Sequence, residues 1–136
     1  MTTAPTITIL SEPEADAFVA EWMEAWNSHD LDRILEHYAD DVEYHSPFIA
    51  QVAEPGGPGA DGRLVGKEPV RAYFAAALAR NADLHFDPPV HVAVGSGSVS
   101  FVYTSIKNLT AVETLVFAPG SRVVARAHCH YRSPAA

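Results

Sequence analysis

The sequence predicts an α+β domain in which three helices of the N-terminal half pack on a strongly curved, mainly antiparallel sheet. Two patterns support this fold class. Apolar residues recur at helical spacing after cap signals in the first 81 residues, whereas strand-like alternation follows from Leu84 onward. Of the 136 residues, 48% are hydrophobic and 19% are charged. We therefore expect a single domain over residues 1–136, with its core over about 12–132.

The first predicted helix starts at the segment 11–14, Ser-Glu-Pro-Glu. This segment combines a capping Ser, a Pro in the first turn and the Glu that completes a capping box. Phe18, Trp22 and Trp26 then recur every four residues and form one apolar stripe. Asp30 is the expected cap of a second, shorter helix.

The second helix is expected to end at residues 40–41, where two Asp residues precede a first strand over 42–46. Residues 53–62 are rich in Gly and Pro and are interpreted as a lid or rim rather than a domain boundary. A short strand over 63–66 and a third helix over 67–81, with a Pro near its start, complete this half.

The C-terminal half is predicted to be an antiparallel meander of two hairpins. The turn sequence of the first hairpin is Gly-Ser-Gly at 95–97, and that of the second is Ala-Pro-Gly-Ser at 118–121. The predicted strands cover residues 90–94, 99–106, 109–117 and 122–131.

Charge and cysteine content limit the classes of function. Nine Lys and Arg against 17 Asp and Glu give a net charge of −8, which argues against nucleic-acid binding. Residues 1–68 carry 14 acids and three bases (−11), whereas residues 69–136 carry three acids and six bases (+3). No apolar run predicts a membrane span, and residues 1–10 lack the features of a signal peptide. Cys129 has no partner for a disulfide, so we expect a cytoplasmic protein.

Glu113 is the last carboxylate side chain of the sequence, and it lies inside the apolar run 111–117. A four-residue hairpin turn predicts that Glu113 lies opposite Arg126, with His128 as its diagonal neighbour. Because side chains alternate along a strand, these three residues and His130 are expected to share one face of the sheet.

Two interpretations of this face remain open. The pattern alone favours a core built from the small apolar side chains of the other face, which leaves Glu113 and Arg126 as an exposed ion pair worth well under about 1 kcal/mol. The alternative is that the polar face lines a pocket. His128-Cys129-His130 also suggests metal binding, but Arg126 on the same face repels a cation, so no metal site is predicted.

Several segments resemble the nuclear-transport-factor-2-like superfamily, and within it the SnoaL-like cyclases and ketosteroid isomerases. They are residues 25–32, 38–42, 66–74 and the last hairpin over 113–131, and the resemblance extends over about 15–132. It implies a cone-shaped, cystatin-like fold in which the concave sheet face lines a pocket under the helices. It also implies a homodimer formed through the convex sheet face.

The resemblance implies that Glu113 stands where these families carry a functional Asp, and that Arg126 and His128 occupy pocket-lining positions beside it. The residues implied to line the pocket are Trp22, Trp26, Ser46, Phe48, Phe74, Phe101 and His130. Two positions depart from ketosteroid isomerases, because Ser46 aligns with their carboxylate base and Trp22 with their oxyanion-stabilising Tyr. Steroid isomerisation is therefore not expected.

The expected function is acid/base catalysis without a cofactor, of cyclase, isomerase or dehydratase type, on a small apolar carbonyl compound. In this hypothesis Arg126 orients Glu113, and His128 exchanges protons with it near neutral pH. The alternative is a non-catalytic module that binds a small ligand or only dimerises. Neither alternative involves a metal, a nucleic acid or a membrane.

Overall fold

Helix α1, Glu12–Ser28, forms where the sequence predicts it in the computed structural model, which describes residues 6–134. The Ser11 hydroxyl accepts the Glu14 N–H at 3.2 Å, and the Glu14 carboxylate accepts the Ser11 N–H at 2.9 Å, which completes the predicted capping box. His29 ends the helix in the left-handed conformation, with φ of 60°. Residues 1–5, half of the segment assessed for a signal peptide, lie outside the described residues.

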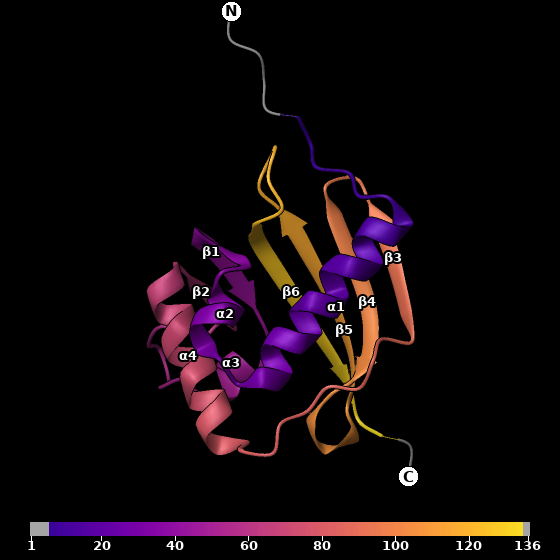
Figure 1. Cartoon of the computed structure of the whole chain (residues 1–136). Helices are drawn as coiled ribbons and strands as arrows, with labels where there is room; N and C mark the ends of the chain where they lie inside the picture. Colours follow the sequence, from indigo (N-terminus) through magenta and orange to yellow (C-terminus); the bar gives the residue numbers. More distant parts are fainter. Residues whose placement is uncertain (1–5, 135–136) are drawn as a thin grey trace, which may run out of the picture.

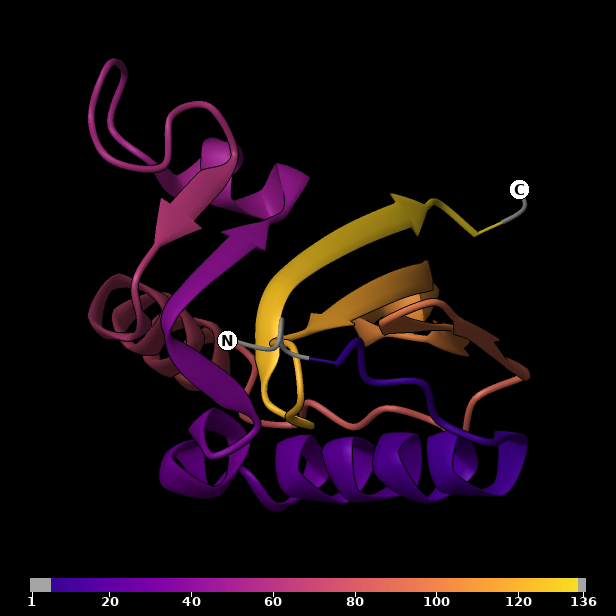
Figure 2. The same cartoon turned by 90° about the horizontal axis from the view of Figure 1, so that it is seen from above.

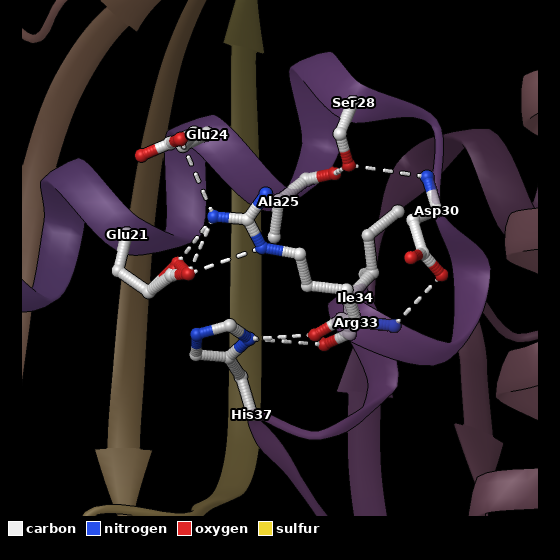
Figure 3. Close-up of polar contacts among 8 residues, drawn as sticks. All are labelled: Glu21, Glu24, Ala25, Ser28, Asp30, Arg33, Ile34 and His37. Carbon is white, nitrogen blue, oxygen red and sulfur yellow. Dashed lines mark hydrogen bonds and ion pairs between the residues drawn. The ribbon is translucent and has the colours of Figure 1, made fainter.

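Helix α2, Leu31–Leu35, is fastened to α1 by charged side chains (Figure 3). Asp30 caps it, because its carboxylate accepts the Arg33 N–H at 3.2 Å. The Arg33 guanidinium reaches back to α1 and lies 2.7 Å from the Glu21 carboxylate and 3.6 Å from that of Glu24. These groups are partly exposed, so the contact sets the angle between the two helices more than it stabilises the fold.

The first strand begins earlier than the sequence predicts. Strand β1, Tyr38–His45, includes Asp40 and Asp41, which were expected to end the second helix. Tyr38 pairs with Val124 of the last strand, and the pairing is irregular between Tyr38 and Glu43. Pairing with a distant segment therefore overrides the local helix-ending signal.

A short helix that the sequence analysis did not predict follows β1. Helix α3, Pro47–Val52, has Ser46 as its N-cap, and the Ser46 hydroxyl accepts the Phe48 N–H at 3.2 Å. Its signal was a capping Ser followed by Pro. Six residues are too few to show an apolar period, so only the cap could have predicted this helix.

The six strands form one sheet in the order β2-β1-β6-β5-β4-β3. All neighbours are antiparallel except β1 and β6. The remaining elements are β2 (Arg63–Val65), α4 (Lys67–Arg80), β3 (His91–Gly95), β4 (Ser98–Thr104), the 3-10 helix η1 (Ile106–Asn108), β5 (Thr110–Phe117) and β6 (Val124–Arg132).

Helix α1 lies along one face of the curved sheet, and α2 and α4 cover its β1–β2 end (Figures 1 and 2). Alternate residues of β4 and β5 point to this covered face, where they are buried against the apolar stripe of α1. Trp22 lies at the centre, 5.0 Å from the Phe101 ring and 5.7 Å from the Tyr103 ring. The predicted α+β class is confirmed, with one additional short helix.

The last hairpin pairs in a different register from the one predicted. Glu113 lies opposite Cys129, whereas the four-residue turn predicted Arg126 at that position. The register has therefore moved by 129 − 126 = 3 residues. An odd shift turns the side chains of β6 from Arg126 onward to the other face, whereas Val124 keeps its predicted face. Arg126, His128 and His130 consequently do not share a face with Glu113.

Two local features produce this shift. The connection between the strands runs to Val123, whose carbonyl accepts the Ala118 N–H at 2.9 Å, so Phe117 pairs with Val124 instead of Arg122. A bulge next to Phe117 then adds one more residue on β6. The longer connection alone would have preserved the predicted faces, and the bulge is the feature that exchanges them.

None of the helices over residues 6–134 is long and apolar enough to cross a membrane.

The loop over 53–62 packs on α3 at Gly59, which is buried and has φ of 84°. A Cβ added to Gly59 would lie only 2.7 Å from Cγ2 of the buried Ile49. Gly56 in the same loop has φ of 74°, and a Cβ there would meet nothing within 4 Å.

We predict that Gly59→Ala lowers the free energy of unfolding by about 2–4 kcal/mol, and Gly56→Ala by about 1 kcal/mol. Both replacements carry the backbone cost of a positive φ, so the difference between them measures the overlap with Ile49. Urea denaturation of the two variants checks this. Equal losses would contradict the packing of the loop on α3.

Candidate active site

Glu113 is buried at the centre of β5, with a relative exposure of 2%. The Tyr103 hydroxyl donates a hydrogen bond to its Oε1 at 2.6 Å. Burial raises the pKa of Glu113 to about 7, although the Tyr103 hydroxyl and the Cys129 thiol act to lower it. Arg126, which was expected to lie opposite Glu113, pairs with Val116 instead and does not offset the effect of burial on this pKa.

A cavity of about 70 Å³ lies beside Glu113 between the helices and the sheet. Its wall is mainly aromatic and includes four of the residues predicted from the sequence, namely Glu113, Trp26, Phe48 and Phe74. The other lining residues are Tyr44, Tyr73, Ala77, Asn81, Leu84, Phe86, Tyr103, Ser105, Ile106 and Tyr131.

Two buried polar atoms on this wall lack a partner. Among the described residues, Nε1 of Trp26 and Oε2 of Glu113 are the buried side-chain nitrogen and oxygen atoms without a hydrogen bond. An unsatisfied buried polar group costs about 1–3 kcal/mol, and native structures contain few of them. Both residues line the cavity, and an oxygen-bearing ligand is the kind of molecule that could supply the missing partners.

A larger hollow of about 550 Å³ adjoins the cavity, and we call it the vestibule. The cavity and the vestibule share five lining residues, Phe48, Tyr73, Ala77, Asn81 and Ile106. The vestibule alone has the volume of a typical small-molecule site. The two hollows therefore adjoin each other between α3, α4 and η1.

The four other predicted pocket residues, Trp22, Phe101, Ser46 and His130, lie elsewhere. Trp22 is buried in the core, and its Nε1–H donates to the Tyr38 hydroxyl at 3.0 Å. Phe101 packs against the Trp22 ring and does not border the cavity. Ser46 caps α3 and borders a separate hollow together with His128 and His130.

The structure separates the predicted polar partners from Glu113. Arg126 and His130 are exposed, and His128 is partly exposed, on the face of β6 opposite to the cavity. The His128 ring stacks on that of His45 with centroids 4.4 Å apart. Partial burial and the neighbouring charges, first His45 and then Arg126, lower the pKa of His128. Across residues 6–134, no three His, Cys, Asp or Glu side chains are grouped to hold a metal ion.

The tyrosines that line the cavity were not among the site residues predicted from the sequence. Tyr103 is the only one of them that bonds to Glu113, from a diagonal position across β4 and β5, where Phe101 pairs with Glu113. Aligning the alternating apolar residues of β4 and β5 could have predicted this contact between Tyr103 and Glu113. Tyr44 accepts the Cys129 thiol at 3.2 Å.

Glu113 is the one group on this wall whose ionisation changes near neutral pH. Burial raises the pKa of Tyr44, Tyr73, Tyr103 and Tyr131 above the usual value, so these phenols stay neutral. With a pKa of about 7, Glu113 exists in both forms, and its Oε2 can accept or donate a proton.

The chain is similar to solved structures of this fold. A SnoaL-like protein of unknown function from Burkholderia thailandensis shares 41% identity, has a TM-score of 0.83 and aligns over 93% of this chain and 100% of that one. A protein of unknown function with a cystatin-like fold from Methylobium petroleophilum shares 15% identity, with a TM-score of 0.68, over 95% and 82%. The epoxide hydrolase/cyclase-like enzyme SalBIII, from pyran ring formation in the polyether salinomycin, shares 16% identity, with a TM-score of 0.67, over 90% and 93%.

At 15% and 16% identity, the last two structures show a common fold and nothing about activity. No curated protein matches the sequence. The family model described as the SnoaL-like domain matches residues 19–136, which is most of the chain. The relative with 41% identity agrees with this match over its full length. The chain therefore belongs to the SnoaL-like domain family.

Proposed function

We propose that the protein is a cofactor-independent acid/base enzyme that acts on a small, mostly apolar carbonyl compound. Glu113 is the group that moves the proton, and Trp26 is the hydrogen-bond donor to the carbonyl oxygen. The observation that carries this proposal is the presence of two unpartnered polar atoms, Oε2 of Glu113 and Nε1 of Trp26, on one aromatic cavity. One is a proton acceptor or donor and the other is a fixed donor, which are the two groups that enolisation requires.

The first step is proton abstraction from the carbon next to the carbonyl. The C–H bond breaks, its proton forms an O–H bond with Oε2 of ionised Glu113, and the electron pair moves to the carbonyl oxygen. The Trp26 Nε1–H stabilises the resulting enolate oxygen. The Tyr103 hydroxyl, bonded to Oε1 at 2.6 Å, fixes the carboxyl so that Oε2 remains for the substrate.

The second step determines the type of reaction. Return of the proton by Glu113 to another carbon gives an isomerisation, and its transfer to a departing hydroxyl gives a dehydration. Attack of the enolate on a second carbonyl carbon of the same molecule gives a cyclisation. Because the described residues on the wall include one carboxyl and no histidine, Glu113 performs both transfers. This replaces the partnership with His128 expected from the sequence.

The size of the site limits what it accepts. The cavity of about 70 Å³ is smaller than a typical ligand site and takes the reacting carbonyl end. The rest of the ligand extends into the vestibule of about 550 Å³.

We also propose that a second copy of the chain covers the outer sheet face. Val102, Val112 and Val116 point outward there and are only partly buried. The sequence predicted a mainly apolar outer face, but Ser100 and Thr114 lie between these valines, and β6 adds Arg126 and His128. The interface in this proposal therefore combines valines with polar side chains.

We predict that the protein accelerates exchange of the α-protons of 2-tetralone in D₂O, measured by NMR. Glu113→Gln is expected to slow this exchange by about 10²-fold or more while 2-tetralone still binds. The matched control is Glu43→Gln, which removes a partly exposed carboxylate of β1 and leaves the exchange unchanged. Binding of 2-tetralone without faster exchange would favour the non-catalytic binding module.

We predict that Glu113 makes the protein less stable as the pH rises. Because the pKa of Glu113 is raised to about 7, the folded state holds this proton more tightly than the unfolded state. The stability it contributes is complete below about pH 4.5 and is lost as the pH rises through about 7, by up to about 3 kcal/mol.

Glu113→Gln should therefore gain stability over the original protein with rising pH, as measured by urea denaturation at several pH values. The hydrogen bond from His45 lowers the pKa of Glu43, so Glu43→Gln should show a dependence of the opposite sign. A constant difference between the Glu113→Gln variant and the original protein would show that Glu113 is not buried as described.

We predict that the protein sediments as a dimer and that Val112→Glu shifts it to the monomer, because the substitution places a charge at the centre of the outer face. Val90→Glu is the control, since Val90 is 66% exposed outside the strands. Sedimentation velocity over a range of concentrations measures both. A monomeric original protein would refute the proposed dimer.

A further inference from the structure

The vestibule has an unusual charge for this protein. Its described lining residues include two bases, Arg80 and Lys107, and no Asp or Glu. The whole chain carries 17 acids and nine bases, so a hollow with only positive side chains is contrary to its composition. The polar side chains beside the two bases are the amides of Gln51 and Asn81, which are neutral.

Neither base of the vestibule has an ion-pair partner. Within the described residues, no carboxylate oxygen lies within 4.0 Å of Arg80 or Lys107. Five of the nine basic residues do form such pairs, and they are Arg33, Arg63, Lys67, Arg71 and Arg122. The two bases on the vestibule wall are therefore available to a ligand.

The two bases come from separate elements that meet at one end of the molecule. Arg80 is the last residue of α4, and Lys107 lies in η1 between β4 and β5 (Figure 1). The negative end of the α4 dipole accounts for a base at Arg80. It does not account for Lys107, which has φ of 55°. Asp83 and Asp87 line a neighbouring hollow that also includes Lys107, but neither borders the vestibule.

We propose that the substrate carries a carboxylate at the end remote from its reacting carbonyl, and that Arg80 and Lys107 hold this carboxylate in the vestibule. The inference rests on the proposed function, because it names the substrate class of the same site. The carbonyl end occupies the aromatic cavity at Glu113, and the carboxylate end occupies the adjoining vestibule, which shares five lining residues with the cavity. A guanidinium and an ammonium group suit a carboxylate that keeps part of its hydration.

The net charge of the whole chain supports the pairing of a substrate carboxylate with Arg80 and Lys107. A net charge of −8 repels an anionic ligand at long range, so its capture requires a local positive field at the entrance. The substrate class is therefore an oxo acid with an apolar body, rather than a wholly apolar ketone.

The test compares two probes that differ by one carboxylate group, 2-tetralone and 6-carboxy-2-tetralone. Dissociation constants are measured by ligand-observed NMR at low and high ionic strength. We expect the carboxylate probe to bind about three- to tenfold more tightly at low ionic strength, with the difference reduced by salt. The double variant Arg80→Gln/Lys107→Gln should abolish the difference and leave the affinity for 2-tetralone unchanged.

Arg126→Gln is the matched control, because it removes an equally unpaired base from the outer sheet face. It should leave both affinities unchanged. Equal affinities of the original protein for the two probes, or a preference that survives the double variant, would overturn the inference. The exchange assay distinguishes failure of this inference from failure of the proposed function. Glu113-dependent exchange with equal affinities overturns the inference alone, whereas charge-dependent binding without exchange overturns catalysis alone.

Discussion

The burial of one carboxyl group, that of Glu113, is the constraint on which the site depends. A carboxylate in an apolar interior is strongly unfavourable unless it is paired or protonated. Here the Tyr103 hydroxyl satisfies one oxygen, and the raised pKa allows the group to remain neutral. The other oxygen borders a cavity instead of a packed side chain. The fold thus holds a group with a pKa of about 7 on a rigid strand, which is the requirement for proton transfer at neutral pH.

Two tryptophans one turn apart on α1 differ in whether their indole N–H groups have a hydrogen-bond partner. Trp22 is buried, and its Nε1–H is satisfied by the Tyr38 hydroxyl at 3.0 Å. Trp26 packs against Phe74 with ring centroids 4.7 Å apart, but its Nε1–H has no partner among the described residues. The sequence period places both on one apolar stripe and cannot distinguish them. The distinction depends on Tyr38, a residue whose position follows from the parallel pairing of β1 with β6.

The predictions from sequence succeeded where the determinants are local and failed where they are not. The cap at Ser11 and the apolar stripe fixed α1, and the resemblance placed Glu113 in a pocket that its strand pattern alone did not favour. The partners of Glu113 were wrong because a single bulge in the last hairpin reverses the faces of β6. No local sequence feature marked that bulge. Tyr103 was overlooked because its contact with Glu113 depends on pairing between two strands.

In the proposed complex, Arg80 and Lys107 on the vestibule wall and the Glu113 carboxyl in the cavity would affect each other through the charge of the substrate. An anionic substrate bound near Glu113 without compensation would raise the pKa of Glu113 further and hold it in the protonated form. Glu113 could then donate a proton but could not abstract one. In the proposed complex, Arg80 and Lys107 on the vestibule wall would offset the charge of the substrate carboxylate and so limit this rise in the pKa of Glu113. The two bases would then serve both to bind the substrate and to keep the buried carboxyl able to act as a base.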